Sequence, residues 1–236
     1  MNGTIKSIFL SMVVMSASAL PAITSAAPSV VIELFTSQGC SSCPPADALL
    51  GELARRPDIV ALAYHVDYWD DLGWKDAFSI PEAAQRQRGY VSRLSRAGAF
   101  TPQAVVSGDT SLIGSNRMQM NEAIAIDRDT LPIDLSKVDA NLRIRFPESW
   151  QETMDVYVVS YLDHATTQVG RGENAKKSLQ EFNVVRSVKR IGRWNGKPQT
   201  MTVALATFPR DATAVAVLLQ RSGQGAIAGA ATTTLR

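Results

Sequence analysis

The chain has 236 residues, with 24 Lys and Arg against 22 Asp and Glu, and a formal net charge of +2. A nearly neutral chain lacks the clustered cations that phosphate contact requires, so the composition argues against a nucleic-acid partner. The sequence holds two cysteines, Cys40 and Cys43, which is too few for a four-cysteine zinc site.

The first residues have the pattern of a secretory signal peptide. Lys6 precedes an apolar run over residues 8–19, and small residues follow up to Ala26. The run is shorter than the about 20 residues of a membrane-spanning helix, and no second apolar segment is long enough to cross a bilayer. We expect residues 1–26, with one Lys and no acid, to be removed, which leaves a chain of net charge +1 without a membrane span. The mature protein is then periplasmic or extracellular.

The mature chain opens with a strand, a helix and a second strand. Residues 30–35 form a β-branched and aromatic run that predicts a buried strand. Residues 46–55 place three leucines on one helical face and end before Pro57, which predicts a helix. The apolar run 59–66 predicts a second strand. Because a helical crossover joins parallel strands, we expect a βαβ unit.

The segment from residue 67 to residue 129 predicts an insertion followed by a hairpin and a helix. The insertion, 67–98, combines a polar and aromatic loop with a basic helix. A turn signal, Gly108-Asp109, separates two short strands, and Ser115 is a suitable N-cap for the helix after it. The elements expected in this segment are a loop over 67–80, helices over 81–96 and 116–127, and strands over 103–107 and 111–114.

Apolar residues alternate with polar ones through most of the chain after residue 130. The alternating segments lie around residues 142–146, 156–161, 184–191, 201–205 and 215–219. This period predicts an antiparallel sheet or sandwich with one solvent-exposed face. We therefore expect two domains, an α/β domain over 27–129 and a mostly β, sandwich-like domain over 130–236.

The pair Cys40 and Cys43 is the strongest candidate for chemistry. A disulfide is plausible in an exported protein, yet a loop this short contributes only about 2 kcal/mol of stability. A cysteine at the start of a helix faces the positive end of the helix dipole, which lowers the pKa of its thiol. This arrangement favours Cys40 as the nucleophile and Cys43 as the thiol that resolves a mixed disulfide.

Several segments resemble a known group of proteins. Residues 34–43 are similar to the strand that leads into the dithiol site of glutaredoxins and other thioredoxin-fold proteins. Residues 33–47, 65–69, 100–103 and 172–174 together resemble bacterial secreted thioredoxin-like proteins that are catalogued only as a domain of unknown function. The resemblance implies a thioredoxin-like α/β fold for the first domain and no established reaction.

The resemblance also implies roles for particular residues. Thr101 and Pro102 match the cis-proline loop that lies beside the dithiol and docks a substrate peptide. Glu33 lies near the buried acid that relays protons in thioredoxins; the alternative is a strand-end charge that faces water. Thioredoxins proper have Gly-Pro between the cysteines, whereas this chain has Ser41-Ser42, followed by Pro44-Pro45. The two prolines suit a helix that begins at Pro44, which weakens the dipole effect on Cys40.

These observations favour thiol–disulfide exchange with an exported protein or a small thiol. The cysteines carry the electrons themselves, so we expect no cofactor. One alternative is a soft-metal module that binds copper(I) through Cys40, Cys43 and His65, since thiolates and imidazole suit that ion. Another is a binding protein without catalysis that keeps the scaffold and a local disulfide.

Overall fold

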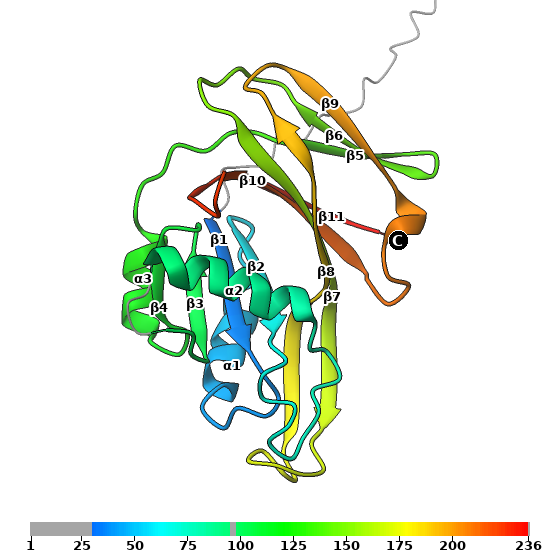
Figure 1. Ribbon diagram of the computed structural model, residues 1–236. Helices are drawn as coiled ribbons and strands as arrows, with labels where there is room; N and C mark the ends of the chain where they lie inside the picture. The colour runs from blue at the N-terminus through cyan, green and yellow to red at the C-terminus, as the bar shows by residue number, and fades with distance from the viewer. Residues whose placement is uncertain (1–29, 95–97, 236) are drawn as a thin grey trace, which may run out of the picture.

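The computed structural model describes residues 30–94 and 98–235, which form a mostly β structure (Figure 1). The helices are α1 (Pro44–Leu53), α2 (Pro81–Leu94) and α3 (Arg117–Ile124), with a short 3-10 helix at Leu205–Thr207. The strands of the first half are β1 (Val30–Thr36), β2 (Ile59–His65), β3 (Gln103–Val106) and β4 (Thr110–Ile113). Those of the second half are β5 (Asp134–Val138), β6 (Asn141–Phe146), β7 (Met154–Gln168), β8 (Ser178–Trp194), β9 (Gln199–Ala204), β10 (Ala214–Arg221) and β11 (Ile227–Thr234). The predicted signal peptide, residues 1–26, lies outside the described residues.

One mixed sheet of eight strands runs through both halves of the chain, in the order β11-β10-β7-β8-β2-β1-β3-β4. The predicted class, an α/β thioredoxin-like domain followed by a separate antiparallel sandwich, is therefore wrong. The two halves meet where β2 pairs in parallel with β8, with Ala63 opposite Val184. Residue periodicity identifies strands but not their partners, which explains why the sequence did not predict this junction. A domain boundary near residue 129 stays a prediction.

The predicted βαβ unit is present at the centre of this sheet. β1 and β2 are parallel and in register from Val30 opposite Ile59 to Thr36 opposite His65. The helix between them begins at Pro44, where a proline without an N–H group fits the first turn. The cysteine motif therefore lies in the tight connection between the end of β1 and the start of α1.

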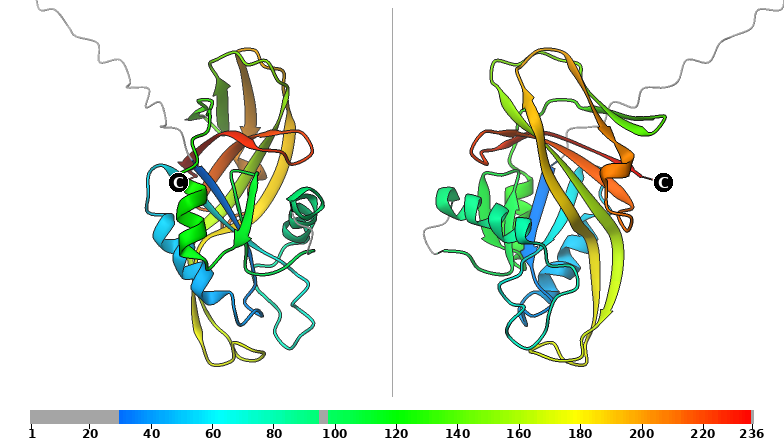
Figure 2. Two further views of the ribbon diagram at one scale, coloured as in Figure 1. Left: turned by 90° about the vertical axis from the view of Figure 1, so that its left-hand side faces the viewer. Right: turned by 45° about the vertical axis from the view of Figure 1, so that its right-hand side comes forward.

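Helices cover both faces of the β1–β4 part of the sheet (Figure 2). Side chains of α1 and α3, such as Leu50 and Met120, pack against one face together with Ile32 and Leu34 of β1. Side chains of α2, such as Tyr90, pack on the opposite face. Successive residues of β1 thus point toward different helices, as strand geometry requires.

The second half of the chain adds a long hairpin and a second sheet. β7 and β8 pair over most of their length, and their far end extends beyond the sheet toward the start of α1 (Figure 1). Strands β5, β6 and β9 form a separate three-stranded sheet. Leu142 and Phe146 of β6 pack in one core cluster with side chains of β7 and β10 and with Trp194 at the end of β8. The sequence did not predict β5, and the helix α3 is capped by Asn116 rather than Ser115. In the described residues, none of the helices has the length and apolar character to span a bilayer.

Candidate functional site

Cys40 and Cys43 form a disulfide between the end of β1 and the first turn of α1, with their Cα atoms 5.4 Å apart. Cys43 is the N-cap residue of α1, and its carbonyl accepts backbone hydrogen bonds from Ala46 and Asp47. Both cysteines have no exposed surface, whereas Ser41 and Ser42 between them are exposed. The disulfide therefore lies just below the surface, under a loop that solvent reaches.

The Thr101–Pro102 loop lies beside the disulfide connection, and its peptide bond is cis. A Cβ atom added to Gly114 would lie 3.4 Å from Pro102 Cβ and 3.2 Å from Ala46 Cβ in the first turn of α1. The indole of Trp69 donates a hydrogen bond to Thr101 Oγ1 over 3.0 Å. An added Cβ at Gly39 would meet Trp69 Cβ at 3.1 Å. The structure thus brings Thr101 and Pro102 next to the cysteine loop, with Trp69 between the two segments.

The tip of the β7–β8 hairpin holds the cysteine loop from the other side. The fully buried Asn174 donates from Nδ2 to the carbonyl oxygens of Gln38 and Cys40, each over 2.9 Å. The backbone N–H of Ser41 donates to Glu173 Oε2 over 3.2 Å. Hydrogen bonds from the side chain and the backbone of Ser41 lower the pKa of the Glu173 carboxyl. Two side chains of one hairpin therefore hold three backbone groups of the cysteine loop.

A buried glutamine anchors the loop from inside. Gln38 Nε2 donates to Glu181 Oε1 over 2.7 Å and to Thr167 Oγ1 over 3.0 Å, and both acceptors lie on the β7–β8 hairpin. Gln38 Oε1 accepts a hydrogen bond of 2.9 Å from the indole of Trp74. The Gln38 backbone N–H donates to Asp76 Oδ2 over 2.8 Å. Both the amide and the backbone of Gln38 are therefore fixed by residues that follow it by 36 positions or more.

Three titratable groups lie below the disulfide loop. Burial opposes a charge on His65, but the carboxylate of Asp76, 2.8 Å from Nδ1, raises the pKa of His65 to about 9. Burial alone would raise the pKa of Asp76, but the nearby His65 and several hydrogen bonds lower it below its ordinary value. Burial raises the pKa of Asp47 to about 7, although Thr36 Oγ1 donates to Asp47 Oδ1 over 2.8 Å. Asp47 follows Cys43 by one helical turn and lines a cavity of about 380 Å³ between α1 and β8.

Glu33 does not face the disulfide. It points to the face of the sheet that α2 covers, where it is fully buried and pairs with Arg86. Tyr90 donates a further hydrogen bond to the same carboxylate. The alternation of side chains along β1 explains this placement, because Ile32 and Leu34 face α1 and Glu33 faces away from it. The predicted exposure to water is wrong, and the placement gives no support to the predicted proton relay.

His65, the third member of the alternative copper site, makes its close contact with Asp76. Across residues 30–94 and 98–235, no three His, Cys, Asp or Glu side chains are grouped as metal ligands. The structure therefore does not assemble Cys40, Cys43 and His65 into one group.

Several residues of the site were missed as functional candidates. Glu173 and Asn174 belong to a segment that carries the family resemblance, but nothing local indicates that they contact the cysteine loop. Asp76 and Gln38 carry no pattern that distinguishes them from ordinary loop residues. Asp47 offered a usable signal, since a carboxylate four positions after Cys43 lies on the same side of the helix.

No curated protein matches the chain. The structure is similar to an X-ray crystal structure of a protein from Agrobacterium tumefaciens, with 32% sequence identity and a TM-score of 0.78. The match covers 89% of this chain and 96% of the other. The family described as a protein of unknown function (DUF1223) matches residues 31–220, and the chain therefore belongs to that family.

Proposed function

We propose that the protein exchanges disulfides with an exported protein or a small thiol through Cys40 and Cys43. The observation that carries the proposal is the position of the disulfide at the N-terminus of α1, under the exposed loop Ser41-Ser42. The helix N-terminus stabilises a thiolate that is released when the S–S bond breaks. The short loop also contributes little stability, so a bracing role accounts poorly for the bond. The export in this proposal rests on the signal-like residues 1–26.

The chemistry needs no group beyond the two cysteines and the substrate. A substrate thiolate attacks Cys40 Sγ, the S–S bond breaks, and its electron pair stays on the Cys43 sulfur, which takes up a proton. A second substrate thiolate attacks the substrate sulfur of the mixed disulfide and releases Cys40, which also takes up a proton. The substrate dithiol loses two electrons and the protein disulfide gains them. In the reverse direction the Cys40 thiolate attacks a substrate disulfide and Cys43 resolves it.

We assign the attacking role to Cys40. Its Sγ lies 3.3 Å from Ser42 Oγ, a hydroxyl that can donate to a thiolate. Cys43 lies at the base of the loop, one turn before Asp47. Asp47 has a pKa of about 7 because of its burial, which suits a group that exchanges a proton with the Cys43 sulfur near neutral pH.

Because both sulfurs are buried, the exchange requires the covering segment to open. The contacts of Asn174 and Glu173, at the tip of one hairpin, are among those that hold the cysteine loop in place. Opening of this kind is a local event that leaves the sheet intact. The fixed tip would then control the rate of exchange, and Pro102 and Trp69 would border the exposed sulfur.

The test is the reduction potential of the disulfide in a series of glutathione mixtures, with thiol trapping and mass spectrometry as the readout. We expect a value between about −120 and −270 mV, the range of catalytic dithiols, and its position in that range assigns the direction of exchange. A potential below about −300 mV, typical of structural disulfides, would overturn the proposal. Cys43→Ser should accumulate a mixed disulfide with glutathione on Cys40. The matched variant, Cys40→Ser, should accumulate much less, and the opposite order would reverse the assigned roles.

A further inference from the structure

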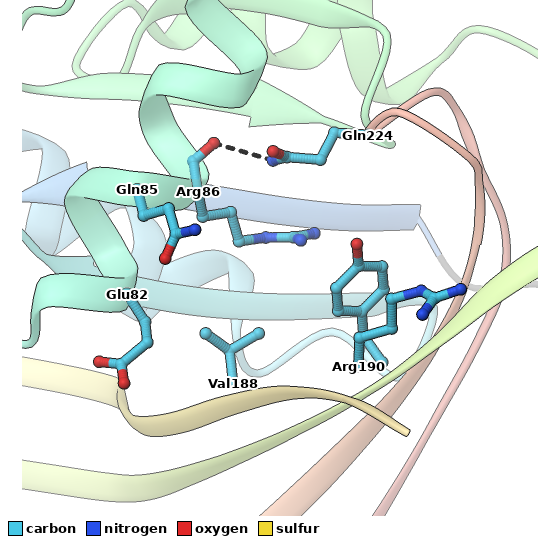
Figure 3. A pocket seen from close by; sticks show the side chains of 7 residues that line it. Glu82, Gln85, Arg86, Val188, Arg190 and Gln224 are labelled. Atoms are coloured by element: carbon cyan, nitrogen blue, oxygen red, sulfur yellow. Dashed lines mark hydrogen bonds between the residues drawn. The ribbon is translucent and has the colours of Figure 1, made fainter. Parts of the chain in front are cut away.

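A second cavity lies on the other face of the sheet, between α2 and the strands β7 and β8. It has a volume of about 280 Å³, near the lower end of small-molecule pockets. Its walls include Glu82, Gln85 and Arg86 of α2 and Tyr157, Val188 and Arg190 of the strands (Figure 3). None of these residues belongs to the disulfide site, so the cavity calls for a separate explanation.

Arg86 forms the buried end of the cavity and is 5% exposed. Its Nε and Nη2 atoms donate to the Glu33 carboxylate, and Nη2 also donates to Tyr90 and Gln220. Among the described residues, the Nη1 atom has no hydrogen-bond partner. It is also absent from the set of described side-chain atoms that are both fully buried and without a partner. Because buried donors are normally satisfied, an Nη1 atom at a cavity wall is available to a ligand.

Arg190 supplies a second guanidinium at the same cavity. Its partner, Asp155, also contacts Arg193, so one carboxylate serves two arginines and leaves an excess of positive charge. In Figure 3 the side chains of Arg86 and Arg190 extend in the same direction, while Glu82 lies toward the opposite end. One end of the cavity therefore carries two guanidinium groups and the other end carries the Glu82 carboxylate. Because Glu33 compensates the charge of Arg86, the excess positive charge at the guanidinium end comes from Arg190.

Apolar surface joins the two ends. The ring of Tyr157 lies 5.0 Å from the Arg86 guanidinium carbon, which fixes both groups against each other. Val188 adds an aliphatic wall. A planar guanidinium fork matches a carboxylate, and the apolar wall suits a short carbon chain attached to it. A phosphate has no carbon chain for this wall, and Glu82 would repel a second negative charge.

We infer that this cavity is a binding site for a small aliphatic monocarboxylate. The carboxylate lies between Arg86 Nη1 and the Arg190 guanidinium, and the carbon chain lies along Tyr157 and Val188. The inference concerns a site separate from the disulfide, and it does not depend on the proposed exchange reaction.

Butyrate is a suitable probe, titrated into the oxidised full chain and followed by nitrogen-15 NMR. We expect saturable shifts at Gln224 and Arg190, with a dissociation constant on the order of a millimolar for a ligand of this size. Butyramide has the same shape without the charge and should bind at least tenfold more weakly. Three results would overturn the inference: equal binding of butyrate and butyramide, shifts that do not saturate with butyrate, or tighter binding of inorganic phosphate than of butyrate.

Arg190 and Arg193 provide a matched pair of variants, since both are partly exposed and both contact Asp155. Only Arg190 lines the cavity. Arg190→Gln should weaken butyrate binding tenfold or more, whereas Arg193→Gln should change it by less than about threefold. Similar effects of the two substitutions would show that the response is general surface electrostatics and would also overturn the inference.

Discussion

The side-chain amide of Asn174 donates a hydrogen bond of 2.9 Å to the carbonyl oxygen of Cys40, across 134 residues of sequence. The same nitrogen reaches the carbonyl of Gln38, so one buried amide satisfies two acceptors of the cysteine loop. Because Asn174 lies at the tip of a hairpin, the position of the cysteine loop depends on the packing of that tip. This relationship leads to the first of four predictions.

Asn174→Ala should accelerate reduction of the Cys40–Cys43 disulfide by dithiothreitol. The substitution removes two hydrogen bonds from buried carbonyls, which costs about 1–3 kcal/mol and makes opening of the tip easier by a similar amount. We expect the reduction rate to rise by about tenfold or more. Stopped time points with thiol alkylation and mass spectrometry measure the rate.

Gln168→Ala is the matched control for this measurement. Gln168 carries an amide in the same hairpin, but it is exposed and donates to Ser178 rather than to the cysteine loop. The disulfide of the Gln168→Ala variant should be reduced at a rate within about twofold of the wild type, because exposed polar contacts contribute little to stability. If Asn174→Ala and Gln168→Ala reduced at the same rate, the tip would not control access to the sulfurs.

Asp47→Asn should make the protein more stable at neutral pH than the wild type. Asp47 has a pKa of about 7 in the folded chain because of burial, against an ordinary value of 3.8. The pKa of this carboxyl is higher in the folded chain than in the unfolded chain. The protein is therefore most stable below the pKa of the unfolded chain, and it loses stability as the pH rises through the pKa of the folded chain. The loss thus falls between about pH 4 and pH 7 and amounts to on the order of 1–4 kcal/mol.

The measurement is urea unfolding of both proteins across that pH range. The gain in unfolding free energy of Asp47→Asn over the wild type should be small near pH 4 and increase toward pH 7. Asp58, a surface carboxyl whose pKa is lowered by Arg56, provides the control, since Asp58→Asn should give no such gain. A gain that is constant with pH would contradict the assignment of a raised pKa to Asp47.

Gly114→Ala should destabilise the fold at the point where Pro102 packs beside α1. The added Cβ would lie 2.5 Å from Leu34 Cδ1, a side chain that is itself buried. Overpacking of this kind costs about 1–3 kcal/mol. In Gly192→Ala, by contrast, the nearest contact is Met201 Cε at 3.7 Å, and its unfolding free energy should change by less than about 0.5 kcal/mol. Equal midpoints in urea for the two variants would refute the close packing.

Glu33→Gln should destabilise the protein strongly. Glu33 neutralises the buried guanidinium of Arg86, and removal of one partner of a buried ion pair typically costs about 3–5 kcal/mol. Glu52→Gln removes the partner of Arg117 on the surface and should leave the thermal midpoint unchanged within error. Calorimetry of both variants decides the matter, and a Glu33→Gln protein as stable as the wild type would show that Arg86 is charged without need of this partner.

Local pattern was sufficient for the central strands, their connecting helix and the cysteine pair. The apolar runs that predict β1 and β2 are local properties, and the helix between them makes the two strands parallel. The two prolines indicated that the helix begins at Pro44, directly after Cys43, as it does in the structure. The position of the disulfide in the chain connection therefore required no tertiary information.

Tertiary structure decided what surrounds that disulfide and which sheet it belongs to. β2 accepts β8 as a neighbour, and the β7–β8 hairpin then carries Asn174 to the carbonyl of Cys40. Period-two alternation shows that a segment is a strand, but every buried strand offers the same backbone donors and acceptors, so alternation does not select a partner. For the same reason the sequence left open which way Glu33 points, since only packing against α2 and Arg86 gives a buried carboxylate its partner.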